Sequence, residues 1–404
     1  MKVMTLHEDE EWLSSEQVAR HLGVKLQTVY AYVSRGVLHP LRRPGQRGSW
    51  FAMAEIAALT GIETASVRRR RRAPGLADDI RTAITWLDEE HFCYRGHDVI
   101  DLTETHSFEE VCSLLWQQDA AGAFVAPELP GIAADLATGV PQAEPYDLLV
   151  LAVTLAGTAD PGRADLAPAA VAAAGARGVA AGITGLGGTV GPARPGQVAA
   201  AVAGLLSGRP HRRGTRLAGL IDDALILLAD HDLALSTTAA RVAASVRADP
   251  YAVLVAGLAA ARSPAHGTAS RAARQLVLDA VADPGRVLGD CLAGTRPPYG
   301  FGHRVLVEAD RRADLILPAV LERAPRRFRE ALATLVDGMW ERRGLPPNVD
   351  LALAVLCAVE QLRPDGGEIL FALARMAGWT AHAIEEYATE PLRFRLRGVY
   401  VGQR

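Results

Sequence analysis

The sequence has few cysteines and little net charge. Its four cysteines, at positions 93, 112, 291 and 357, lie far apart and show no paired spacing. That pattern excludes a disulfide framework or a cysteine-based zinc site and indicates a reducing compartment. The net charge of −3 over 404 residues excludes a chain that binds nucleic acid over its whole surface.

Secretion and membrane signals are also lacking. Residues 1–11 are charged and have no apolar core of the kind that a secretion signal carries. The alanine-rich run at 167–181 is interrupted by Arg177 and two glycines. It predicts a buried helix rather than a membrane span. We therefore expect a cytoplasmic protein without a membrane partner.

The composition is that of a large folded protein. Hydrophobic residues make up 49% of the chain, which is enough for a sizeable core and for two or three domains. Apolar residues recur with a period near 3.6 in long stretches such as 147–155 and 217–228, and strand signals are few. The pattern predicts a mainly α fold.

Residues 1–62 form a separate predicted module. Ser14 opens a first helix, and Gln17 is placed to close a capping box on it. A second helix is predicted from about Gln27 to Ser34. A β-hairpin of 37–38 with 49–51 would follow, with three arginines at its tip, 42–48. The order predicts a winged helix-turn-helix, whose wing arginines would contact phosphate.

This module resembles the winged helix-turn-helix of the MerR and excisionase type, through residues 13–19 and 28–36. Such modules bind DNA or serve as docking and dimerisation units, and both interpretations stay open. The predicted linker, 63–80, holds five adjacent arginines at 68–72. They indicate a solvated tether or an arm along DNA phosphates. DNA is thus a possible partner of residues 12–72.

Residues 81–404 have the composition of a helix-rich enzyme. The first part, 87–102, alternates enough for short strands. Ser107 is then predicted to cap a helix with Val111, Leu114 and Leu115 on its apolar side.

Three short segments further along carry proton-transfer side chains beside glycine or proline. They are residues 263–267, 298–304 and 346–350, and they present His266, His303 and Asp350 at turns or element ends. Two imidazoles and one carboxylate can take a proton from carbon and stabilise the oxyanion that forms. Taken singly, each has a structural interpretation: a hydrogen-bonded histidine, or an aspartate that caps a helix starting at Leu351.

Seven motifs in order, between residues 81 and 402, resemble signatures of the citrate synthase family. Five of them read ADHDLALST at 229–237, SPAHGT at 263–268, GFGHRV at 300–305, PNVD at 347–350 and GWTAHAIEE at 378–386. The resemblance implies a mostly helical homodimer with a large and a small domain, the small one at about 268–362. The chain departs from the family at Thr268, where a glycine is usual, and at Val307, where a basic residue often lies near CoA phosphates.

The resemblance also implies roles for single residues. Asp350 would remove the methyl proton of acetyl-CoA while His266 donates a hydrogen bond to the thioester oxygen. His303 would polarise the ketone of oxaloacetate and protonate the new alkoxide.

Three further residues are implied to bind the ketoacid. His231 would contact it directly, and its structural alternative is a cap on the preceding helix. Arg312 and Arg395 would hold the two carboxylates, because a guanidinium matches a carboxylate bidentately.

The implied reaction condenses acetyl-CoA with oxaloacetate and water to give citrate and CoA. It needs no metal and no cofactor, since the CoA thioester is a substrate. One alternative is 2-methylcitrate synthase with propionyl-CoA, because one methylene changes binding by only about 1–3 kcal/mol. The other is a DNA-binding regulator with a degenerate citrate synthase domain as its sensor.

Overall fold

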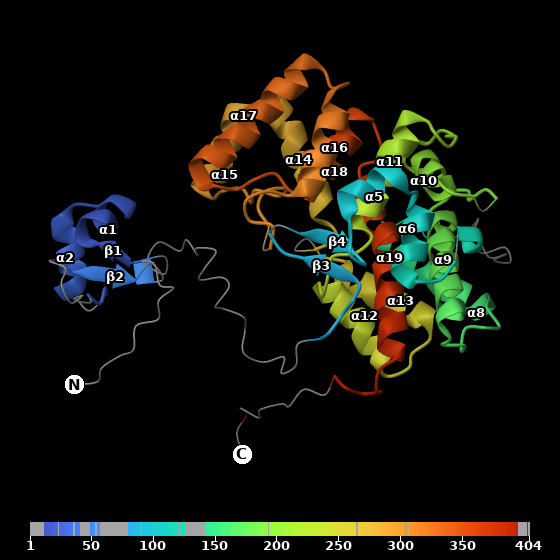
Figure 1. Cartoon of the computed structure of the whole chain (residues 1–404). Coiled ribbons are helices and arrows are strands. Elements are labelled where there is room, and N and C mark those ends of the chain that lie inside the picture. The colour runs from blue at the N-terminus through green and yellow to red at the C-terminus, as the bar shows by residue number, and fades with distance from the viewer. Residues whose placement is uncertain are drawn as a thin grey trace. The chain divides into compact units, whose positions relative to one another are not determined.

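The structure is a computed structural model of the full chain, and it divides into two compact units, Met1–Ile80 and Arg81–Arg404. The residues that it describes are 12–22, 24–34, 37–40, 49–52, 55–56, 80–89, 91–119, 121–125, 140, 142–192, 194–263, 266–303, 305–394 and 402. The units are treated one at a time below (Figure 1).

The described residues of the first unit include β1 (Trp12–Ser14), α1 (Ser15–His21), α2 (Leu26–Ser34) and β2 (Trp50–Ala52). Helix α1 begins with the predicted capping box. Ser14 N donates to Gln17 Oε1 at 2.8 Å, and Gln17 N donates to Ser14 Oγ at 3.3 Å. A small core of its own holds the unit together, built from Val18, Ala19, Val29, Leu38, Phe51 and Ile56.

The predicted wing is wrong in its pairing. β2 pairs antiparallel with β1, with Leu13 opposite Phe51, whereas residues 37–40 form a bend rather than a strand. Phe51 is buried where β2 pairs with β1. The strand partner of β2 is therefore β1 and not residues 37–38. The predicted tip at 42–48 and the arginine run at 68–72 lie outside the described residues.

The second unit begins with a three-stranded antiparallel sheet, β3 (Thr85–Leu87), β4 (Phe92–Tyr94) and β5 (His97–Asp98). These are the short strands that the sequence predicts. Helices α5 (Val99–Thr105) and α6 (Phe108–Trp116) follow. Ser107 and Glu110 cap α6 reciprocally, and Val111 and Leu115 are buried, as predicted.

In the part of the second unit that the structure describes, the remaining elements are helical. Its elements are η1 (Ala121–Ala123), α8 (Pro145–Ala159), α9 (Pro168–Gly185), α10 (Gln197–Ser207), α11 (Arg216–Leu228), α12 (Leu235–Ser245), α13 (Pro250–Ala261), α14 (Ala269–Ala282), α15 (Pro284–Ala293), α16 (Arg311–Leu321), α17 (Arg326–Arg343), α18 (Val349–Val359) and α19 (Gly366–Tyr387). The prediction of a mainly α fold is confirmed.

Helix α19 runs through the middle of this unit. It packs against α9, α11, α12, α13 and α6, and Figure 1 shows it in red with those helices around it. Nearly all its side chains from 366 to 383 are buried. Small residues permit close packing: a Cβ on Gly257 of α13 would lie 2.5 Å from the ring of Trp379.

Helices α14 to α18 gather into one group at the edge of the unit (Figure 1). Within it α14 packs on α15, α17 and α18, and α16 packs on α18. Contacts of α16 with α11 and of α18 with α19 join the group to the larger helical body. This arrangement puts the loop before α14, the loop before α16 and the start of α18 next to α11 and α19.

The alanine-rich run predicted to be a buried helix is α9, whose residues from 171 to 185 are mostly buried. Among the described residues, no helix is both long enough and apolar enough to span a membrane.

Candidate active site

His231 lies just after α11, in a turn against the core. It does not serve as the cap of α11. The carbonyl of Ile226 accepts from the Tyr94 hydroxyl at 3.1 Å, and that of Leu228 accepts from Arg375 Nε at 2.8 Å. Burial, followed by the charges of Arg312 and Arg375, holds the pKa of His231 well below its ordinary value. The imidazole is therefore neutral at physiological pH.

His303 lies within the loop between α15 and α16, and its ring contacts that of His231. The ring centroids are 5.0 Å apart and the rings meet edge to face. The backbone N–H groups of Val305 and Leu306 donate to His303 Nδ1 at 3.1 and 3.0 Å, which leaves the ring proton on Nε2. Burial and then the charge of Arg312 lower the pKa of His303 to about 4.

Arg312 lies in the first turn of α16 and is almost fully buried, with 2% exposure. Asp310, the N-cap of that helix, accepts from Arg312 Nε at 2.9 Å and from Nη2 at 2.8 Å. The same carboxylate accepts from Val349 N at 2.9 Å, at the start of α18. Asp310 therefore ties the arginine to the helix that carries Asp350.

Asp350 lies in the first turn of α18 and is partly exposed. Asn348, and not Asp350, caps this helix, since its Oδ1 accepts from Asp350 N at 2.9 Å. The Asp350 carboxylate is thus left free of the capping role. Burial raises its pKa to about 6; the charges of Arg312 and Arg375 limit the rise, and that of Asp310 adds to it.

His266 lies in the turn between α13 and α14. Its Nε2 is 2.8 Å from Ser236 Oγ at the start of α12, and its ring packs edge to face on Phe371 of α19 at 5.4 Å between centroids. Burial and then the charge of Arg375 lower the pKa of His266 to about 4. The imidazole is therefore neutral, with one nitrogen engaged by Ser236.

Arg375 is a candidate site residue that the sequence analysis missed. It lies on α19 with 1% exposure, and its charge acts on His231, His266, His303 and Asp350. It also stacks over Phe371, with 4.6 Å from Cζ to the ring centroid. An arginine within the apolar run 369–376 is a signal that could have found it, because buried arginines are rare unless a partner is provided.

The structure thus brings together five of the six predicted site residues, with Arg375 as the residue that joins them. His231, His303, Arg312 and Asp350 form one group, and His266 is linked to it through Arg375. Arg395, the sixth, lies outside the described residues, so its position is a prediction still.

A pocket of about 760 Å³ opens at the start of α14, where Thr268, two residues after His266, lines it. Three arginines line it, Arg262, Arg271 and Arg274, together with Thr268 and Tyr299. Tyr146, on its wall, also packs over the turn of His266, because a Cβ on Gly267 would lie 2.2 Å from the Tyr146 hydroxyl. The pocket thus offers positive charge, although Glu144 and Glu368 also line it.

Comparison with known proteins decides the family. A family model described as the C-terminal domain of citrate synthase matches residues 78–396. The chain belongs to the citrate synthase family. It is accordingly a citrate synthase-like acyltransferase, as predicted. A second model, for a helix-turn-helix domain, matches residues 12–51, so the helix-turn-helix prediction is confirmed as well.

The relatives of this citrate synthase-like chain include proteins named citrate synthase and proteins named 2-methylcitrate synthase. 2-methylcitrate synthase 2 of Corynebacterium glutamicum is 28% identical over 351 residues, which cover 78% of the chain and 90% of that protein. Citrate synthase of Saccharolobus solfataricus is 35% identical over 194 residues, which cover 45% of the chain and 51% of that protein. The names leave the acyl group undecided.

Solved structures share the fold of this citrate synthase-like chain. Citrate synthase from Thermotoga maritima matches 82% of the chain and 96% of its own length, with a TM-score of 0.66 and 25% identity. Citrate synthase from Thermoplasma acidophilum, solved as a ternary complex with carboxymethyl coenzyme A and oxaloacetate, matches 82% and 95%, with a TM-score of 0.69 and 22% identity.

Proposed function

We propose that the chain condenses acetyl-CoA with oxaloacetate and water to give citrate and CoA. The observation that carries the proposal is the buried group of His231, His303, Arg312 and Arg375 beside Asp350. The two guanidinium groups and the two neutral imidazoles suit an electrophile with two carboxylates. The Asp350 carboxylate, with a pKa of about 6, suits proton removal from a weak carbon acid.

The ketoacid is bound by the arginines and the histidine pair. Arg312 and Arg375 offer one cation for each carboxylate, in a site where charge-assisted hydrogen bonds are strong. His303 directs its Nε2 proton away from the backbone that binds Nδ1, which suits donation to the ketone oxygen and, after addition, to the alkoxide. In this proposal Arg375 faces one of the two carboxylates, and the binding role of Arg395 remains a prediction.

The thioester is enolised between Asp350 and His266. Asp350 removes a proton from the methyl carbon, and His266 donates to the carbonyl oxygen as negative charge develops there. When Ser236 donates to Nε2 of His266, the proton of that ring is on Nδ1 and is available to the thioester. The enol carbon then adds to the ketone, and water cleaves the resulting citryl thioester to release CoA.

The pocket next to His266 is the proposed site of the CoA phosphates. Arg262, Arg271 and Arg274 supply positive charge there. Arg271 is shared with two carboxylates, Glu144 and Glu368, at 2.8 Å each. Arg262 is held by both oxygens of Asp147, so Arg274, whose Nε has no hydrogen-bond partner among the described residues, is the freer cation for a phosphate.

Thiol release tests this function. Purified protein with acetyl-CoA and oxaloacetate should release CoA, and Asp350→Ala should lower kcat by about 10²–10⁴-fold, as expected for loss of a general base. Asp337→Ala on α17 is the control. The values of kcat/KM for acetyl-CoA and for propionyl-CoA decide between a citrate synthase and a 2-methylcitrate synthase. The relative named 2-methylcitrate synthase 2 is the reason for this comparison.

A second proposed feature is a homodimer through α8 and α12. Large apolar side chains are exposed on these helices, Leu151 at 38%, Leu235 at 76% and Val242 at 42%, and Val246, which follows α12, is exposed at 55%. Such exposure on a folded unit favours a partner surface. Sedimentation of the full chain should give twice the mass of one chain.

A DNA-binding role of the first unit is the candidate function of another class. The helix-turn-helix match supports it, and α2 exposes Gln27, Tyr30 and Ser34. Selection of duplexes from random DNA by the full chain, followed by a salt titration, tests it. A bound sequence without any thiol release would favour the regulator, and thiol release without DNA selection would favour the enzyme alone.

A further inference from the structure

A buried carboxylate fixes the turn that carries His231. Oδ2 of Asp230 accepts from the backbone N–H of Asp232 at 3.1 Å, so His231 is the middle residue of a turn closed by a side chain. Asp232 has a φ of +51°, a left-handed conformation that non-glycine residues adopt only when their surroundings hold them. The direction of the His231 ring therefore depends on the Asp230 carboxylate.

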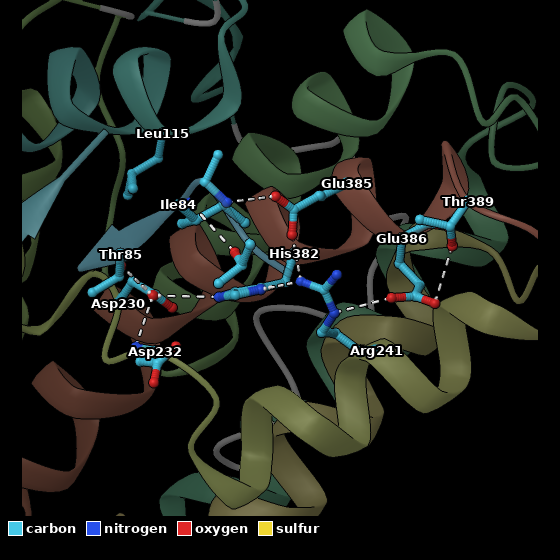
Figure 2. Close-up of polar contacts among 12 residues, drawn as sticks. Ile84, Thr85, Leu115, Asp230, Asp232, Arg241, His382, Glu385, Glu386 and Thr389 are labelled. Atoms are coloured by element: carbon cyan, nitrogen blue, oxygen red, sulfur yellow. Dashed lines mark hydrogen bonds and ion pairs between the residues drawn. The ribbon is translucent and has the colours of Figure 1, made fainter. Parts of the chain in front are cut away.

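Two further donors hold that carboxylate in place (Figure 2). Thr85 Oγ1 on β3 donates at 2.6 Å, and Nε2 of His382 on α19 lies 3.3 Å away. The backbone of α19 also packs directly on Asp230, because a Cβ on Gly378 would lie 2.2 Å from Oδ1. Burial would raise the pKa of Asp230, but His382, Arg375 and Thr85 outweigh it and keep the pKa below its ordinary value.

Arg241 in turn fixes the ring of His382. Nη1 of Arg241 is 2.6 Å from Nδ1 of His382. A guanidinium can only donate, so Nδ1 accepts and the ring proton is on Nε2, directed at Asp230. Arg241 has no exposure, and it is held by Glu385 at 2.7 Å and by Glu386 at 3.0 Å. Figure 2 shows the whole chain of contacts from Thr85 to Glu386.

We infer that Asp230, His382 and Arg241 are positioning residues that set the His231 ring for the ketoacid. None of the three has a role in the proton transfers proposed above. The inference rests on the proposed function, in which His231 binds oxaloacetate. We call the chain of contacts from Thr85 through Asp230 and His382 to Arg241 the relay. Its loss should weaken the binding of the ketoacid and leave the thioester pocket, which lies at α14, unaffected.

Paired variants of the full chain test the relay. His382→Leu removes both hydrogen bonds, and His382→Gln keeps a side-chain N–H that can donate to Asp230. Thr85→Val removes the hydroxyl, and Thr85→Ser keeps it. Thr380→Val is the matched control, because Thr380 is also buried on α19 but donates only to Met376 O of its own helix, at 2.8 Å.

Calorimetric titration with oxaloacetate gives the first readout. His382→Leu should raise the Kd by about tenfold and Thr85→Val by about three- to tenfold. These changes are smaller than the loss of a direct charged hydrogen bond to the ligand, because both residues act only through the turn of His231. The Gln and Ser variants should recover most of the affinity, Thr380→Val should bind as the unmodified chain does, and KM for acetyl-CoA should not change.

Hydrogen exchange of the segment 229–233, measured without ligand, gives a second readout that does not depend on the reaction. Exchange should be faster in His382→Leu and Thr85→Val than in Thr380→Val. Unchanged exchange together with unchanged Kd would overturn the inference, as would an equal rise of Kd for oxaloacetate and KM for acetyl-CoA. If His382→Leu does not fold, Thr85→Val decides. If the unmodified chain does not bind oxaloacetate, the proposed function fails, and hydrogen exchange still decides whether the relay holds the turn.

Discussion

The rings of His231 and His303 meet edge to face, with their centroids 5.0 Å apart. Each ring has a pKa below the ordinary value because it is buried and lies near Arg312 and Arg375. The site thus keeps its positive charge on guanidinium groups, which stay charged at all relevant pH values, and keeps its imidazoles neutral for hydrogen bonding.

The pH dependence of the reaction should follow Asp350. The base is active when ionised, and its pKa is about 6. We therefore expect kcat/KM to rise with pH, to reach half its maximum near pH 6 and to level off above pH 7. The pKa values of His266 and His303, at about 4, lie below this window. Initial rates between pH 5 and 8 check the prediction, and a flat profile would contradict it.

Asp350→Asn should make the protein inactive but more stable at high pH. The folded-state pKa is raised above the ordinary value of 3.8, so the ionised carboxylate disfavours the folded state above about pH 6, and this cost disappears below about pH 4. The gain at pH 8 should reach at most about 3 kcal/mol in the free energy of unfolding. Urea unfolding at pH 8 and pH 4 measures it, with Asp337→Asn, exposed on α17, as the control. Equal effects at both pH values would be inconsistent with this origin.

Arg375→Leu should raise KM for oxaloacetate. The substitution removes a buried cation that would face a carboxylate, and charged hydrogen bonds contribute about 1.5–3 kcal/mol, which corresponds to about 10- to 150-fold. KM for acetyl-CoA should change much less. Steady-state rates with each substrate varied give both values. Arg326→Leu, an exposed arginine of α17, should behave as the unmodified chain does, and a normal KM in Arg375→Leu would rule out its proposed role.

Gly267→Ala should disturb the turn of His266. Its Cβ would lie 2.2 Å from the Tyr146 hydroxyl and 2.8 Å from the carbonyl of Ala261, so the turn must shift. We expect a lower melting temperature and a loss of kcat, and Tyr146→Phe should restore part of each by removing the nearer oxygen. Gly289→Ala on α15 has open space around the new methyl group and should leave stability unchanged or slightly raised. A melting temperature unchanged in Gly267→Ala would contradict the prediction.

The sequence predicted the site best where short motifs carry the chemistry. His266, His303 and Asp350 stand beside glycine or proline, which marks turns and element ends, and these residues are where the structure has loops and a helix start. The helix starts at Ser15 and Phe108 were equally predictable, because a capping box is local. Contacts between segments far apart in sequence were not predictable. β2 pairs with β1, where Trp12 lies opposite Ala52, 40 residues later, and three-residue strands carry no signal for their partner.

Arg375 was missed for a related reason. It stands in a strongly apolar helix, where periodicity predicts only burial, and its role depends on neighbours from α11, α16 and α18 that are far away in sequence. Asn348 shows the converse. An aspartate two positions later was a reasonable cap, but backbone geometry gave that role to Asn348 and freed the carboxylate.

Helix α19 carries Phe371, Arg375, Gly378, His382 and Glu386 at intervals of three or four residues, so all five lie along one stripe. Each residue of an α-helix advances the direction of its side chain by about 100°. Deletion of one residue between Arg375 and His382 would therefore turn His382 away from Asp230 while Arg375 kept its place. Only the loss of a whole helical turn would return His382 to the same side of the helix, and it would then be shifted along the helix axis. The spacing of this helix is for that reason as constrained as the identity of its residues.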